Sequence, residues 1–147
     1  MSKRILLCDD ELHILRAAEV KFARSGYSVQ SACNGAEAWK LIEQQPPDVV
    51  VTDCQMPVMN GLELALKIKE HPPTCHIPVI MLTAKGFELK PGQLRDEYGI
   101  AMLVCKPFSP RELFALVESL LGGEELAGAP VLSGLTSNVP PAVSQWL

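Results

Sequence analysis

The chain has 147 residues, of which 48% are hydrophobic and 20% charged, and its formal net charge is -4 at pH 7. This length suits one domain with a single packed core and leaves little room for a second. The absence of a basic excess argues against a nucleic-acid-binding surface, and no run approaches the roughly 18 apolar residues of a membrane span. Charged residues soon follow the first apolar run, which argues against a signal peptide, so we expect a soluble, cytoplasmic protein.

Short β-rich runs alternate with longer helical stretches along the chain. In its first half we predict strands at 4–8, 27–33 and 48–52 and helices at 11–25 and 36–45. In the first helix, Leu12, Leu15 and Phe22 are expected on the buried face, and Gly26 is expected to end it. The continuous β-branched run before Asp53 predicts a central strand buried on both faces.

The second half continues the alternation. Here we predict helices at 60–70, 91–99 and 109–121, strands at 78–82 and 101–105, and a loop at 85–90. Asn60 with Glu63, and Ser109 with Glu112, have the spacing of capping boxes at helix starts. Lys90-Pro91-Gly92 disfavours an earlier start for the short helix.

Five successive βα units predict an α/β fold. We expect a doubly wound, five-stranded parallel sheet of order 2-1-3-4-5 with helices on both faces. Residues 1–121 would form this domain, and residues 122–147, rich in glycine, proline and serine, a disordered C-terminal tail. The alternative is that the end of the tail, near Trp146, docks on a partner or on the domain itself.

The five cysteines are an odd number and contain no CxxC pair, so a disulfide framework is not expected. We predict that Cys8, Cys54 and Cys105 are small buried residues in or beside strands. A metal site at His71, Cys75 and His76 is disfavoured because prolines intervene and a fourth ligand is missing.

Polar side chains follow the strands at one edge of the predicted sheet. Asp9 and Asp10 come directly after the first strand and Asp53 after the third, which is where the strand order reverses and ligands bind. Three close carboxylates raise one another's pKa unless a cation is present, and a hard divalent cation such as Mg2+ prefers oxygen ligands. Thr83 and Lys106, after the fourth and fifth strands, add a hydroxyl and a positive charge.

These residues resemble the signature positions of bacterial response-regulator receiver domains. The resemblance covers residues 3–121. It is carried by Asp9-Asp10, by the phosphoacceptor-like segment PDVVVTDCQMPVMNG at 47–61, by Thr83-Ala84 and by Lys106-Pro107-Phe108. It implies a flavodoxin-like receiver of the stand-alone, single-domain type, acting in a two-component or phosphorelay system. Such a protein signals through contacts with a downstream protein, without binding nucleic acid or inserting into a membrane.

The resemblance further implies Mg2+-dependent transfer of a phosphoryl group to Asp53 from a histidine kinase or a histidine phosphotransfer protein. Thr83 and Lys106 would contact the phosphoryl group. The Mg2+ ligands implied by the resemblance are Asp9, Asp10, Asp53 and the backbone carbonyl of Gln55. The domain would assist its own phosphorylation and dephosphorylation rather than act as an enzyme on other substrates.

Three further expectations come from the resemblance. Gln55 and Lys85 would border the path of a hydrolytic water and tune the lifetime of the phosphoryl group, although Lys85 also suits an ordinary surface contact. The Lys106–Pro107 peptide bond would be cis. Thr83 would move during switching together with an aromatic residue on the fifth strand, but Leu103 occupies that position, so it either carries a weaker switch or fills the core.

Two other functions are compatible with the same site residues. One is an interaction adaptor whose receiver-like pocket does not cycle phosphate. The other is a Mg2+-dependent aspartyl phosphohydrolase, which would carry a second aspartate two residues after its nucleophile. Gln55 stands at that position, and the chain has no cap domain to enclose a substrate.

Overall fold

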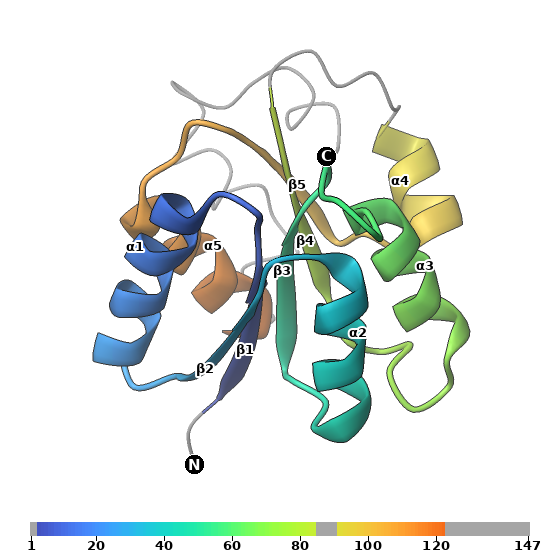
Figure 1. Ribbon diagram of the computed structural model, residues 1–147, viewed down its shortest axis with the longest axis horizontal. Coiled ribbons are helices and arrows are strands. Elements are labelled where there is room, and N and C mark those ends of the chain that lie inside the picture. Colours follow the sequence, from blue (N-terminus) through green and yellow to red (C-terminus); the bar gives the residue numbers. More distant parts are fainter. Residues whose placement is uncertain (1–2, 85–90, 123–147) are drawn as a thin grey trace.

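The computed structural model describes residues 3–84 and 91–122, and these form a single five-stranded parallel sheet flanked by helices (Figure 1). The strand order is β2-β1-β3-β4-β5. The elements are β1 Arg4–Cys8, α1 Leu12–Arg24, β2 Ser28–Ala32, α2 Gly35–Gln44, β3 Val49–Asp53, α3 Gly61–Glu70, β4 Val79–Thr83, α4 Pro91–Tyr98, β5 Met102–Cys105 and α5 Pro110–Gly122. The predicted fold class and strand order are confirmed.

Helices cover both faces of the sheet, with α1 and α5 on one side and α2, α3 and α4 on the other (Figure 1). Alternate strand residues therefore enter two separate cores. In β1, Ile5 and Leu7 belong to the core beneath α1 and α5, whereas Leu6 and Cys8 belong to the core beneath the other three helices. Every residue of β3 and β4 is buried, as expected for central strands of a parallel sheet covered on both faces.

The register brings the carboxyl ends of the central strands to one level. In the parallel ladders, Cys8 of β1 lies opposite Thr52 of β3, and Asp53 lies opposite Leu82 of β4. Each strand then continues into a polar residue at the same edge of the sheet. The positions of Asp9, Asp53 and Thr83 therefore follow from strand pairing alone.

Two helix ends form as their sequences predict. At the end of α1, Gly26 has φ +94°, Gly26 N donates to Ala23 O and Tyr27 N donates to Phe22 O. These are the two hydrogen bonds of a Schellman motif, and the Phe22 and Tyr27 rings, 5.1 Å apart, supply its usual apolar contact. At the start of α3, Asn60 and Glu63 form the predicted capping box.

One predicted core position is wrong. Leu12 is 53% exposed, whereas Leu15 and Phe22 are buried as expected. Leu12 lies ten residues before Phe22, so the two side chains point about 80° apart around the axis of α1. Leu12 is also in the first turn of the helix, which lies beyond the edge of the core. The short helix predicted at 91–99 is present as α4, whereas the predicted loop at 85–90 and residues 123–147 of the tail predicted at 122–147 lie outside the described residues.

The predicted burial is confirmed for Cys8 and Cys54 but not for Cys105, which is only partly buried. All five are free thiols; Cys8 and Cys54 are buried, Cys105 is half-buried, and Cys33 and Cys75 are exposed. Burial raises the pKa of Cys8 to about 12 and that of Cys54 to about 11, so both thiols stay protonated at neutral pH.

Within the described residues no helix is long and apolar enough to cross a bilayer.

Candidate functional site

Three carboxylates meet where the sheet order reverses. Asp9 follows β1 directly and Asp53 is the last residue of β3; both are buried, whereas the neighbouring Asp10 is exposed. One oxygen from each of the three lies within 4.8 Å of the others. Two backbone contacts fix Asp9, because its N–H donates to Ala32 O at 3.1 Å and its Oδ1 accepts from Glu11 N at 2.9 Å.

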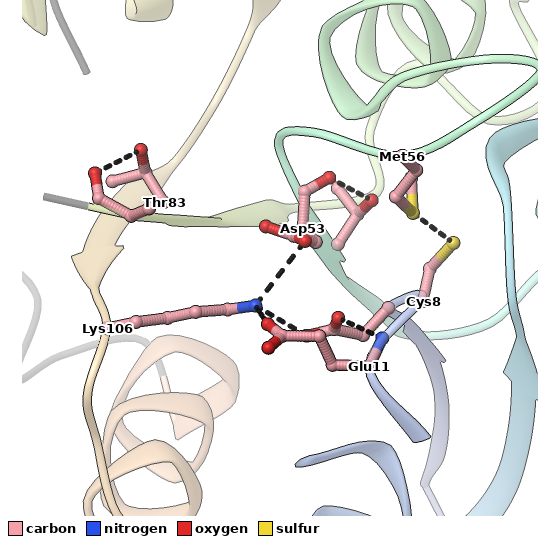
Figure 2. A network of polar contacts seen from close by, with 9 residues as sticks. Cys8, Glu11, Asp53, Met56, Thr83 and Lys106 are labelled. Atoms are coloured by element: carbon pink, nitrogen blue, oxygen red, sulfur yellow. Dashed lines mark hydrogen bonds and ion pairs between the residues drawn. The ribbon is translucent and has the colours of Figure 1, made fainter. Parts of the chain in front are cut away.

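Lys106, the residue after β5, extends its ammonium into this cluster (Figure 2). Its Nζ lies 3.1 Å from Asp9 Oδ2 and 3.4 Å from Asp53 Oδ2. The shortest contact of the ammonium is with Glu11 Oε2, at 2.6 Å. Only 14% of the Lys106 side chain is exposed, so its charge acts in a partly desolvated setting where ion pairs are stronger than at the surface.

The cluster shifts the ionisation of its members. Burial, followed by the charge of Asp9, raises the pKa of Asp53 to about 6, although Lys106 opposes this effect. Burial also raises the pKa of Asp9. Burial alone would lower the pKa of Lys106, but the hydrogen bond to Glu11, the ion pair with Asp9 and the surrounding negative charge raise it, so the lysine remains charged.

Thr83 lies buried at the end of β4, on the same edge as Asp53. Its Oγ1 donates to Ala84 O at 3.1 Å, and Figure 2 shows the hydroxyl apart from the Asp53 carboxylate. Gly61 brings the start of α3 close behind Asp53, since its N–H donates to Cys54 O at 2.9 Å. A Cβ at Gly61 would stand 2.2 Å from Asp53 O, so only glycine permits this approach.

The donor set fits a hard divalent cation. Asp9 Oδ2 is buried and accepts no hydrogen bond among the described residues, although it pairs by charge with Lys106. Such an oxygen lacks a partner that a cation would supply. Three carboxylates at this spacing carry more negative charge than one ammonium balances, and oxygen ligands of this kind suit Mg2+.

Four further site residues were predicted from the sequence: Gln55, Lys85, Leu103 and Pro107. Gln55 is exposed in the loop after β3, and Lys85 lies outside the described residues. The Lys106–Pro107 peptide bond is cis, the predicted isomer. Leu103 is 1% exposed and packs in the core that also holds Leu94 and Ile100, so in this conformation it fills the core.

The acidic cluster is the one group of three close metal-ligating side chains among the described residues, so His71, Cys75 and His76 do not form such a group. Sequence reasoning missed two contacts at the site. One is Glu11 with Lys106, whose only signal was a third acidic residue after Asp9-Asp10. The other is Cys8 Sγ, which lies 3.3 Å from Met56 Sδ and has no signal in the sequence pattern.

A cavity of about 400 Å³ adjoins Lys106 on the side of α1 and α5. Its lining residues come from three parts of the chain and are Glu11, His13, Ile14, Ala84, Lys106, Pro107 and Phe108. The ammonium therefore stands between the carboxylates and this cavity.

Comparison with known proteins defines the class. The family model of the response regulator receiver domain matches residues 5–118, and the chain belongs to this family, which is the signalling domain of response regulators in two-component systems. The solved structures similar to it include a putative response regulator from Chloroflexus aurantiacus J-10-fl, with 30% identity, a TM-score of 0.74 and coverage of 83% of this chain and 99% of that one. The chemotaxis response regulator CheY4 of Vibrio cholerae is 26% identical, with a TM-score of 0.73 over 82% of this chain and 99% of that one.

Among curated relatives, the chain is 38% identical over 127 residues to the alkaline phosphatase synthesis transcriptional regulatory protein PhoP of Bacillus subtilis (strain 168). The match covers 86% of this chain and 52% of PhoP. The transcriptional regulatory protein SrrA of Staphylococcus aureus (strain NCTC 8325 / PS 47) is 38% identical over 121 residues, covering 82% of this chain and 48% of SrrA. The chain thus spans about half the length of these relatives.

Proposed function

We propose that Asp53 is the phosphoacceptor of this receiver, and that phosphorylation changes its contacts with a downstream protein. The observation that carries the proposal is the convergence of Asp9, Asp53 and Lys106 within ion-pair distance at the reversal of strand order. The phosphoryl group would come from a phosphohistidine of a histidine kinase or a histidine phosphotransfer protein. Thus the side chains of the site would assist a reaction on the protein's own carboxylate.

In this step an Asp53 carboxylate oxygen attacks phosphorus, an O–P bond forms and the N–P bond to the histidine breaks. The electron pair of that bond returns to the imidazole nitrogen, which takes up a proton. The nucleophile must be ionised, and a pKa of about 6 leaves most Asp53 ionised at neutral pH and above. Dephosphorylation is the attack of water on the same phosphorus, which releases inorganic phosphate and restores the carboxylate.

The residues around Asp53 handle the negative charge of the transferring group. Phosphoryl transfer depends mainly on positioning and electrostatic stabilisation, and Lys106 supplies a fixed positive charge 3.4 Å from Asp53 Oδ2. Thr83 can turn its hydroxyl from Ala84 O to a phosphoryl oxygen. Mg2+, held by Asp9, Asp10, Asp53 and the Gln55 carbonyl, would neutralise charge on the phosphoryl oxygens.

The finer organisation is proposed on the family resemblance. The receiver would extend to about residue 121, residues 122–147 would form its tail, and the protein would act in the cytoplasm. Gln55 and Lys85 would tune the phosphoryl lifetime, and Leu103 would take part in switching with Thr83. Output through protein contacts alone remains a prediction, because the chain spans about half the length of relatives named as transcriptional regulators.

The test is incubation of the protein with acetyl phosphate and MgCl2, followed by intact-mass measurement. We expect one phosphoryl adduct that requires Mg2+ and is absent from Asp53→Asn. Asp96→Asn, the same substitution at an exposed position on α4, should be phosphorylated like the wild type. No adduct on the wild type would favour the non-cycling adaptor, and turnover of many phosphate esters would favour the phosphohydrolase.

A further inference from the structure

We propose that Glu11 is a positioning residue for Lys106: it holds the ammonium at the edge of the acidic cluster, closer to Glu11 than to Asp53, and competes with the phosphoryl group for it. This inference rests on the proposed function of Asp53. It assigns a role to a residue that lies beyond the acidic cluster, at the start of α1, and whose side chain contacts the site through the lysine.

The distances rank the partners of the ammonium. Lys106 Nζ is 2.6 Å from Glu11 Oε2 but 3.4 Å from Asp53 Oδ2. Charge-assisted N–H···O bonds have lengths of about 2.7–2.9 Å, so the first contact is a close hydrogen-bonded ion pair and the second is a looser one. In this conformation the main partner of Lys106 is therefore Glu11 rather than the proposed phosphoacceptor.

The helix end supports the same role for Glu11. Glu11 occupies the N-cap position of α1, where a short polar side chain would normally accept a hydrogen bond from the first turn. Its side chain makes no such capping bond and extends to Lys106 instead. The Glu11 N–H donates to Asp9 Oδ1, which holds the backbone of Glu11 beside the acidic cluster.

The charge balance predicts that removal of Glu11 weakens the binding of Mg2+ and strengthens the binding of a phosphoryl-like anion. Without Glu11, Lys106 would pair only with Asp9 and Asp53, the same carboxylates that would hold Mg2+, so the lysine would compete more strongly with the cation. Once Mg2+ and a phosphoryl-like anion occupy the site, the anion becomes a partner of Lys106. Glu11 then competes with the anion, and its removal favours anion binding.

The experiment measures two dissociation constants by calorimetry on the full chain, with MgCl2 alone and with beryllofluoride in saturating MgCl2. We expect Glu11→Gln to weaken Mg2+ binding and to tighten beryllofluoride binding, each by about two- to five-fold, the range of an exposed ion pair. Glu11→Asp keeps the charge but loses reach, so it should behave like Glu11→Gln. Glu43→Gln, which removes an exposed charge from α2, should match the wild type.

A double-mutant cycle separates contact from general charge effects. In a Lys106→Met background, Glu11→Gln should change neither dissociation constant. The inference is overturned if Glu11→Gln has the same effect in that background, if Glu11→Asp behaves like the wild type, or if neither constant moves. A wild-type protein that binds Mg2+ but no beryllofluoride overturns the proposed function, and one that binds neither overturns both.

Discussion

Asp53 is a carboxyl group placed where burial and the charge of Asp9 oppose its ionisation. Its neighbour Lys106 compensates only in part, because the ammonium lies closer to Glu11 and Asp9 than to Asp53. An ionised, partly desolvated carboxylate is a good acceptor for a cation or a phosphoryl group, but it costs stability when neither is bound. Proposed function and stability are therefore opposed at this residue.

This opposition predicts that Asp53→Asn stabilises the protein at neutral and alkaline pH. The folded-state pKa of Asp53 is raised to about 6 from 3.8, so the folded state binds the proton more tightly than the unfolded state does. Stability is thus lost as pH rises from about 4 to 6, and the loss persists above that range. The shift corresponds to an upper limit of about 3 kcal/mol.

The measurement is urea unfolding in EDTA at about pH 4 and pH 8. We expect Asp53→Asn to unfold at higher urea than the wild type at pH 8, with a much smaller difference at pH 4. Asp96→Asn, at an exposed site, serves as the control for loss of charge. A variant less stable than the wild type at pH 8 would contradict the argument.

At the scale of single residues, the site residues that follow or end a strand could be predicted from the sequence. Asp9, Asp53 and Lys106 each follow or end a strand, and strand pairing brings them together. The partner of Lys106 could not be predicted, because it depends on the path of the Glu11 side chain across the end of α1. N-cap preferences give no reason to expect a glutamate there.

The elements position the site through close backbone contact. The first turn of α3 lies against the end of β3, with Gly61 between them and Met81 Sδ also close. No side chain fits at Gly61 without displacing backbone. The precision of the Asp53 position therefore depends on where α3 begins.

We expect Gly61→Ala to destabilise the fold by at least about 2 kcal/mol, because its Cβ would meet Asp53 O at 2.2 Å. Gly92→Ala is the matched control in the first turn of α4, where a Cβ meets nothing within 4 Å. That control should gain up to about 1 kcal/mol from helix propensity. Thermal unfolding of both variants tests the contrast, and equal effects at the two positions would refute it.

The boundaries of the elements were predictable because several local signals agreed. Gly26, Asn60 and Ser109 mark helix ends in the sequence, and all three act there in the structure: Gly26 with positive φ, Asn60 and Ser109 as acceptors for the first turn. Leu12 was misplaced because apolar spacing does not show how far the core extends along a helix. That limit is set by the sheet edge, which is a tertiary property.

For the whole molecule, the order β2-β1-β3-β4-β5 gathers polar groups from four strands at one edge. The fold could be predicted because five successive βα units with right-handed crossovers favour a doubly wound parallel sheet, and 2-1-3-4-5 is one of its common strand orders. The charge balance of the site could not be predicted, because it depends on distances between side chains from distant parts of the chain. This imbalance predicts that a bound cation stabilises the protein.

We therefore expect MgCl2 to raise the melting temperature of the wild-type protein by several degrees, and EDTA to reverse the rise. A ligand that binds only the folded state stabilises it by about 2.7 kcal/mol at a free concentration of 100 times its dissociation constant. Asp9→Asn, which removes one buried carboxylate of the cluster, should largely abolish the shift. Differential scanning calorimetry would show this, and an equal shift in Asp9→Asn would place the cation elsewhere.

The central position of β1 also has a consequence for the order in which the protein assembles. β1 precedes β2 and β3 in the chain but lies between them in the sheet, so the acidic residues are together once these three strands have paired. The balancing ammonium is 53 residues beyond Asp53, at Lys106, after the last strand. A partly folded chain without β5 would hold the repelling acids without their counter-charge, which disfavours that intermediate and favours cooperative closure of the whole sheet.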